Sequence, residues 1–275
     1  MSYYKVLGLQ KEPFSTSPDP QFFFHSLSHD TALKRLEIAI RLRRGLNLIL
    51  GDVGTGKTTL SRTLLQMFKG EDGYIFHMIL DPSHKSEFQF LQGLVKMFGI
   101  TPVFKSTLDF KEALEKYLFQ KGVEENKTIV LLIDEGQKIT QENLEVLRML
   151  LNYETNEYKL LQLVIMAQVE LLSRLKRIHN FMDRISLKYT INPLDEAETK
   201  EMLEFRLKQA GFNGQNSFFS DEAIRLIYQQ TQGYPRRIAM LCHDALESIV
   251  MKERSVVDRE IINSLIEQEE KVYAG

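Results

Sequence analysis

The chain has 275 residues, with 35 lysines and arginines against 37 aspartates and glutamates, so its net charge of −2 gives no overall basic field for nucleic acid or an anionic membrane. Its apolar content of 43% is ordinary for a globular protein, and a single cysteine, Cys242, excludes an internal disulfide framework. No apolar run is long enough to cross a bilayer and the N-terminus lacks a signal-peptide pattern, so we expect a cytoplasmic protein.

The first part of the chain predicts an arm followed by a helix. Residues 12–28 are rich in proline and phenylalanine, which predicts an irregular arm. Asp30 then resembles the N-cap of an amphipathic helix that ends in a basic cluster of Arg41, Arg43 and Arg44. These cations suit the negative end of a helix, and a nucleic-acid contact is the alternative interpretation.

The next segment fits the phosphate-binding loop pattern G-x-x-x-x-G-K-[ST] at every required position. Its residues are Gly51, Asp52, Val53, Gly54, Thr55, Gly56, Lys57 and Thr58. The apolar run 46–50 before it predicts a strand, and the spacing of leucines over 59–68 predicts a helix after it. Glycines let backbone N–H groups turn toward phosphate oxygens, and the helix dipole adds positive potential there. We therefore expect Lys57 to meet the β- and γ-phosphates of a nucleotide and Thr58 to hold Mg²⁺.

Further strands and helices alternate along the chain. Apolar runs predict strands at 74–80, 128–133, 160–167 and 185–191, and amphipathic spacing predicts helices at 88–98, 108–119 and 143–151. The run 128–133 is continuously apolar, which is typical of a strand buried on both faces of a parallel sheet. The alternation predicts an α/β fold with a parallel five-stranded sheet flanked by helices.

Acidic and polar residues follow two of these strands. Asp134 and Glu135 come directly after the strand 128–133, and Gln168 comes after the next one. In a phosphate-loop protein, the first acid can hold the Mg²⁺ shell and the second can polarise the attacking water. A helix N-cap with a first-turn acid is the alternative interpretation of Asp134 and Glu135. Ligands of open α/β sheets bind outside the carboxyl ends of the strands, where all three side chains would lie.

Pro193 marks a predicted boundary. Residues 1–192 would form the N-terminal arm and the phosphate-loop core, and residues 193–275 a small all-helical lid domain. Asp195 and Glu198 resemble a capping box, and helical stretches follow near 221–230, 235–252 and 258–270.

The order of these motifs resembles the AAA+ ATPases, and within them the ExeA/GspA family of general-secretion-pathway ATPases and their short pilus-biogenesis relatives. The resemblance covers nearly the whole chain. It is carried by Gly8-Leu9, Pro13-Phe14, Ser17-Pro18-Asp19-Pro20, Ser28-His29, Ala32-Leu33, Gly51 to Thr59, Asp134-Glu135 with Gln137, Gln168 with Glu170-Leu171, Pro193-Leu194, and Gly233 with Pro235-Arg236-Arg237-Ile238.

The resemblance implies a role for several of these residues. Gly51 to Thr58 would be Walker A, with Thr59 beside it; Asp134 would be the Walker B acid and Glu135 the catalytic glutamate. Gln168 would be sensor 1 and Arg236 the lid arginine called sensor 2, with an ordinary surface arginine as the alternative. Arg184 is our choice for an arginine finger that acts on a neighbouring subunit, ahead of Arg174 and Arg177.

Three positions depart from the family pattern. Gly136 stands where the family usually has alanine. Ala167 and Val169 replace the usual glycine and proline around Gln168.

The resemblance implies an ATPase that uses ATP and Mg²⁺. Its nucleotide-dependent homo-oligomer, a ring or filament, would couple hydrolysis to the assembly of a secretion or pilus machine and act on a client protein. The alternative is a DNA-binding regulator of transposition of the TniB/TnsC type, in which Arg41, Arg43 and Arg44 repeated around a ring would supply a basic track for DNA. The sequence identifies neither the client nor the size of the oligomer.

Overall fold

The structure is a computed structural model that describes residues 2–101, 106–178, 180–214 and 217–273. The chain divides into two compact units. The sheet unit consists of Ser28–Val53 and Leu60–Ile191, and the helical unit consists of Met1–Leu27, Gly54–Thr59 and Asn192–Gly275. In the described ranges, none of the helices combines the length and the apolar character needed to cross a bilayer.

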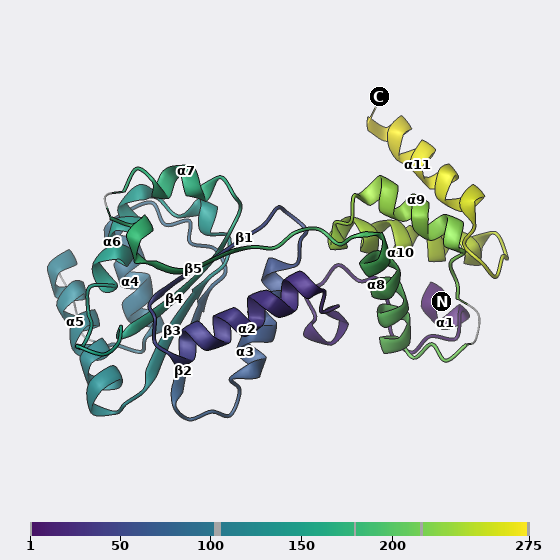
Figure 1. The fold of residues 1–275 in the computed structure, drawn as a ribbon. Coiled ribbons are helices and arrows are strands. Elements are labelled where there is room, and N and C mark those ends of the chain that lie inside the picture. The colour runs from purple at the N-terminus through teal and green to yellow at the C-terminus, as the bar shows by residue number, and fades with distance from the viewer. Residues whose placement is uncertain (1, 102–105, 179, 215–216, 274–275) are drawn as a thin grey trace. The chain divides into compact units, whose positions relative to one another are not determined.

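The sheet unit is built on five parallel strands in the order β2-β3-β4-β1-β5 (Figure 1). The strands are β1 (Leu46–Leu50), β2 (Tyr74–Ile79), β3 (Thr128–Ile133), β4 (Leu161–Ala167) and β5 (Ile185–Thr190). Every residue of β1, β3 and β4 is buried, as expected for central strands that are covered on both faces. The predicted five-stranded parallel sheet is confirmed.

Helices cover both faces of this sheet. Figure 1 shows α4, α5 and α6 on one side of it and α2 and α3 on the other. The elements of this unit are α2 (Leu27–Arg41), α3 (Lys57–Met67), α4 (Glu87–Met97), α5 (Thr107–Phe119), the π-helical turn η2 (Gln120–Glu124), the 3-10 turn η3 (Gly136–Lys138), α6 (Gln141–Leu150), α7 (Leu171–Leu175) and the 3-10 turn η4 (Met182–Arg184). The short α7 and the turns η2, η3 and η4 were not among the predicted elements.

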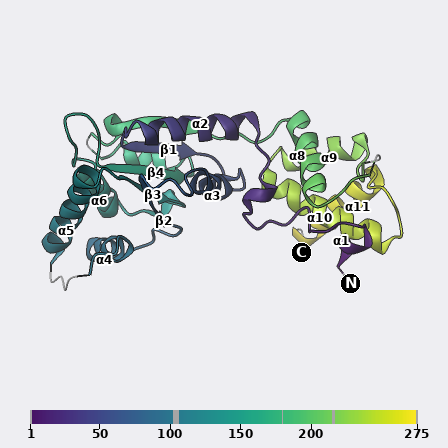
Figure 2. The ribbon, with the colours of Figure 1, turned by 90° about the horizontal axis from the view of Figure 1, so that it is seen from below.

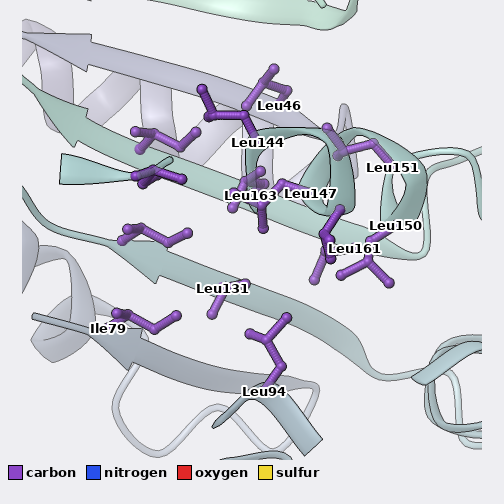
Figure 3. Close-up of a cluster of buried hydrophobic side chains, with 14 of the residues drawn as sticks. Leu46, Ile79, Leu94, Leu131, Leu144, Leu147, Leu150, Leu151, Leu161 and Leu163 are labelled. Atoms are coloured by element: carbon purple, nitrogen blue, oxygen red, sulfur yellow. The ribbon is translucent and has the colours of Figure 1, made fainter. Parts of the chain in front are cut away.

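The core under α4, α5 and α6 consists mainly of aliphatic side chains, together with several phenylalanines. Figure 3 shows Leu131 and Leu163 of neighbouring strands among leucines of α6, including Leu144 and Leu147. Alternate residues of a strand face opposite sides of a sheet, so β3 and β4 each bury one set of side chains here and another on the opposite face. The two-sided burial explains why these strands appear in the sequence as continuous apolar runs.

The start of α2 differs from the sequence prediction. Asp30 was expected to be the N-cap, but the helix begins at Leu27 and Asp30 lies in its first turn. The N–H of Leu27 donates to Glu198 Oε1 at 3.2 Å, so a carboxylate from a distant part of the chain satisfies the orphan donor. Asp30 instead occupies a position where an acidic side chain favours the positive end of the helix.

The helical unit contains α8 (Glu196–Gln209), α9 (Asp221–Thr231), α10 (Pro235–Met251) and α11 (Arg259–Tyr273), together with the N-terminal α1 (Tyr3–Val6) and the 3-10 turn η1 (Pro20–Phe22). Figure 2 shows α1 beside α10. The capping box predicted at Asp195 and Glu198 is confirmed. Cys242 is fully buried in α10, where it packs as a small apolar residue, and this burial raises the pKa of its thiol.

The N-terminal arm is fixed to this unit by buried contacts. Phe14 is 1% exposed and meets the ring of Phe219 edge to face, with ring centroids 5.9 Å apart. Arg206 of α8 donates through Nη1 to the carbonyls of Ser15 at 3.2 Å and Pro13 at 3.5 Å. Burial lowers the pKa of Arg206 to about 10, yet the guanidinium stays charged at neutral pH. The arm is therefore part of the helical unit's core.

Gly233 joins two segments of this unit at very close range. Its φ is +73°, its carbonyl accepts from the N–H of Leu194 at 2.9 Å, and a Cβ built on it would lie 1.8 Å from the Leu194 carbonyl oxygen. Gly8 has a similar φ of +75° but open space around the same position. A substitution at Gly8 would therefore test backbone strain alone, whereas one at Gly233 would add a steric clash.

We predict that Gly233→Ala lowers the free energy of unfolding by more than about 3 kcal/mol, because the backbone must move apart. Gly8→Ala should lower it by only about 1–2 kcal/mol, the penalty of a left-handed L-residue. Denaturant unfolding followed by circular dichroism measures both values. Equal losses for the two variants would show that the close approach at Leu194 is not a constraint.

Candidate nucleotide-binding and hydrolysis site

Three strand ends meet at one edge of the sheet. β4 pairs with β1 on one side and with β3 on the other, all in parallel. Leu50 is paired with Ala167, and Ile133 is paired with Ile165. The sheet therefore brings the segments after β1, β3 and β4 to the same edge, although they are far apart in the sequence.

The phosphate-loop segment leaves β1 at this edge and leads into α3. The N–H of Gly51 donates to the Ala167 carbonyl at 3.1 Å, which continues the β1–β4 ladder by one residue. Gly54 and Gly56 have φ values of +86° and +94°, which L-residues rarely adopt. Helix α3 then begins at Lys57, so the strand, loop and helix predicted around the motif are all present.

Side chains of this segment differ sharply in burial. Thr55 is 1% exposed and Lys57 is 7% exposed, whereas Val53 is 60% exposed. Thr58 and Thr59 are half-buried at the first turn of α3, and Asp52 is exposed. A buried lysine at a helix N-terminus makes this position electropositive, which suits an anionic ligand.

The second half of the loop packs on the start of α10 within the helical unit. The N–H of Arg236 donates to the Gly54 carbonyl at 3.2 Å, and a Cβ on Gly54 would lie 3.1 Å from Arg236 Cβ. The neighbouring Arg237 turns its guanidinium over the ring of Tyr234, 5.2 Å from the centroid. Of the two arginines, Arg236 is the one in contact with the loop.

The acidic pair after β3 has distinct surroundings. Asp134 is 2% exposed, and its N–H donates to the Ile79 carbonyl at 2.8 Å, which extends the β2–β3 ladder. Its Oδ1 accepts from the N–H of Glu135 at 2.9 Å. Glu135 has a φ of +52°, uncommon for a residue with a side chain, and such strain is frequent at functional sites. Glu135 occupies the N-cap position of η3, but its side chain makes no capping hydrogen bond there.

Polar contacts join Glu135 to neighbouring groups. Its Oε2 accepts from Gln137 Nε2 at 2.8 Å. Lys138 Nζ lies 3.9 Å from the same oxygen and 3.8 Å from Asp81 Oδ1. The N–H of Gln168, at the tip of β4, donates to Gln137 Oε1 at 3.1 Å. Sequence reasoning placed Gln168 at this edge but did not anticipate the contacts of Gln137.

Gly136 lies against β4 too closely for a larger residue. A Cβ at this position would be 2.4 Å from Ile165 Cγ2 and 3.2 Å from Ala167 Cβ. The alanine that the family usually has at position 136 therefore does not fit beside this β4. In this chain β4 carries the side-chain methyl group of Ala167, and the residue that faces it after β3 is Gly136.

The three candidate arginines differ in their partners. Arg174 of α7 donates through Nη1 to the Gln137 carbonyl at 2.6 Å and through Nη2 to the Ile139 carbonyl. Arg184 ends η4, just before β5, and its buried Nε has no hydrogen-bond partner among the described residues. Arg177 is exposed. Arg174 is thus held by its own chain, and Arg184 is not held in this way.

The oxygen ligands predicted for Mg²⁺ are of the right chemical type. The hydroxyl of Thr58 and the carboxylate of Asp134 are hard oxygen donors, which Mg²⁺ prefers. Within the described ranges, no group of three or more His, Cys, Asp or Glu side chains is placed to hold a metal ion. The candidate Mg²⁺ ligands are therefore the two separate oxygen donors of Thr58 and Asp134, and not a cluster of three or more acidic side chains.

Comparisons with known proteins agree with this arrangement. A family model described as "AAA domain" matches residues 40–175. General secretion pathway protein A of Aeromonas hydrophila is 34% identical over 253 residues, which is 89% of this chain and 44% of that protein. The chain therefore spans less than half the length of this relative.

Solved structures with the same fold include Cdc6p and ORC proteins. Cdc6p of Pyrobaculum aerophilum superposes with a TM-score of 0.67 at 17% identity, over 89% of this chain and 67% of that one. Drosophila ORC, in a structure bound to DNA, gives a TM-score of 0.65 at 21% identity over 96% of this chain and 65% of that one. At these identities the likeness concerns the fold alone.

The parallel sheet, the loop between β1 and α3, and the acidic pair after β3 lie inside or beside the matched domain, and the similarity to general secretion pathway protein A extends over most of the chain. Residues 40–175 therefore form a domain of the AAA family, and the chain as a whole is related in sequence to general secretion pathway protein A.

Proposed function

We propose that the chain binds ATP with Mg²⁺ at the edge formed by the ends of β1, β3 and β4 and hydrolyses it. The observation that carries the proposal is the pairing of β1, β4 and β3, which brings the phosphate-loop strand and the acidic pair to one edge. Lys57 would contact the β- and γ-phosphates together with backbone N–H groups of the loop after Gly51, whose own N–H donates to the Ala167 carbonyl. Thr59 follows in the first turn of α3 and would complete the loop's contacts.

The remaining site residues have separate roles in this proposal. Thr58 and Asp134 would hold Mg²⁺, which when bound offsets the negative charge of the phosphates. Glu135 would orient and polarise the attacking water, and Gln168 would contact the γ-phosphate as sensor 1. Arg236, whose N–H donates to the Gly54 carbonyl, would act as sensor 2 by coupling nucleotide binding at the loop to the position of α10.

The proposed biological role is a cytoplasmic motor for a secretion or pilus machine. It is supported by the 34% identity with general secretion pathway protein A, and the client protein is unidentified. A nucleotide-dependent homo-oligomer, ring or filament, would couple hydrolysis to movement of this client. Arg184 is the proposed finger, because Arg174 is already bound to carbonyls of its own chain.

The alternative, a DNA-binding regulator of transposition, depends on a basic track. Arg41, however, donates to Glu37 at 2.9 Å and to both carboxylate oxygens of Glu71 at 2.9 Å. Arg43 donates to the Thr128 hydroxyl and to the Asn126 side chain, at 2.9 and 3.0 Å. Two of the three cluster arginines are therefore engaged within the sheet unit, which favours the helix-end interpretation over a phosphate contact.

We predict that Lys57→Ala abolishes ATP binding, whereas Glu135→Gln binds ATP and loses turnover by about 10²–10⁴-fold. The first change removes the ammonium group that would contact the phosphates. The second replaces the Glu135 carboxylate with a neutral amide of the same shape. Fluorescent-nucleotide titration and phosphate release measure the two properties, and circular dichroism checks that both variants fold. Equal loss of ATP binding in the two variants would assign Glu135 a structural role.

We also predict that inactive variants complement one another when mixed. Arg184→Ala keeps a sound pocket without a finger, and Lys57→Ala has no pocket but can donate Arg184 to its neighbour. An arginine finger contributes about 10³–10⁵-fold in turnover, so a minority of correct interfaces should be measurable by phosphate release. If the variants co-assemble and the mixture stays inactive, Arg184 is not a finger in trans, and Arg177 becomes the candidate to test.

A further inference from the structure

We propose that Gln137 is a positioning residue that fixes the Glu135 carboxylate for hydrolysis and connects it to the tip of β4. The inference rests on the proposed function, because the role of Glu135 in activating water belongs to that proposal. Gln137 lies in η3, one turn after the acidic pair, and is half-buried.

Both ends of the Gln137 amide are used, and only one orientation of the amide satisfies them. Nε2 donates to Glu135 Oε2 at 2.8 Å, and Oε1 accepts from the N–H of Gln168 at 3.1 Å. An ionised carboxylate only accepts hydrogen bonds and a backbone N–H only donates. A flipped amide would therefore lose both bonds. The side chain acts as a bridge of defined polarity from β3 to β4.

The backbone that carries this bridge is held from two sides. Gly136 lies against β4 so closely that a Cβ would meet Ile165 Cγ2 at 2.4 Å. On the other side, Arg174 donates to the carbonyls of Gln137 and Ile139, and Ile139 is fully buried. With its main chain fixed by α7 and β4, Gln137 reaches both partners from one position.

Glu135 itself depends on this contact for its orientation. Its backbone is fixed by a φ of +52° and by the bond from its N–H to Asp134 Oδ1, but its side chain is 39% exposed. The other partner of its carboxylate is Lys138 at 3.9 Å, which lies equally close to Asp81. An exposed ion pair of this length orients a side chain weakly. Removing the amide should therefore leave ATP binding intact and disorder the carboxylate.

The test uses the 275-residue chain and steady-state phosphate release over a range of ATP concentrations with Mg²⁺. Gln137→Leu removes both bonds with a shorter apolar side chain, whereas Gln137→Glu keeps an acceptor for the Gln168 N–H but cannot donate to Glu135. Loss of a hydrogen bond to a charged group should lower kcat by about 10- to 100-fold in both variants. KM should stay within a few-fold. Gln92→Leu, exposed on α4, is the matched control and should keep wild-type values.

A double-mutant cycle separates positioning from a general loss of structure. If Gln137 acts through Glu135, adding Gln137→Leu to Glu135→Gln should reduce residual single-turnover hydrolysis no further. Wild-type kcat in Gln137→Leu or in Gln137→Glu, or a full further loss in the double variant, overturns the inference while the proposed function stands. A wild-type chain without Mg²⁺-dependent turnover overturns the proposed function, and this inference with it.

Discussion

The parallel pairing of β4 between β3 and β1 is the constraint on which the candidate site depends. This register sets Leu50 beside Ala167 and Ile133 beside Ile165, so groups distant in the sequence end at one edge of the sheet. The strands are buried on both faces, so a shift by one residue would exchange the side chains packed on the two sides of the sheet and disrupt the close packing of both layers. The positions of the candidate site residues at the strand ends are therefore set by the packing of the buried sheet.

A second constraint is the close approach of the turn after β3 to β4. Gly136 leaves no room for a side chain, because a Cβ there would lie 2.4 Å from Ile165 Cγ2. The Cβ that is absent at Gly136 would lie 3.2 Å from the Cβ that is present at Ala167. The turn therefore lies close enough to β4 for Gln137 to accept a hydrogen bond from the N–H of Gln168.

The sequence was informative wherever the signal was local. The apolar strands, the phosphate-loop motif and the capping box of Asp195 and Glu198 each depend on residues within a few positions of one another. It missed contacts whose partner is distant: the N–H of Leu27, at the start of α2, donates to Glu198, which lies 171 residues away. The contacts of Arg174 and Gln137 were missed for the same reason. Donors of these types have no preferred sequence spacing from their acceptors.

In the proposed function, the edge formed by the ends of β1, β3 and β4 is one Mg²⁺-dependent ATP site per chain. Calorimetric titration of the Glu135→Gln chain with ATP, with Mg²⁺ and then with a chelator, tests it most directly because hydrolysis no longer obscures binding. We expect saturation at one ATP per chain and much weaker binding once Mg²⁺ is removed, since Thr58 and Asp134 would act through the metal. If the folded chain shows no saturable binding, or if binding does not depend on Mg²⁺, the strand ends do not form a Mg²⁺-dependent ATP site.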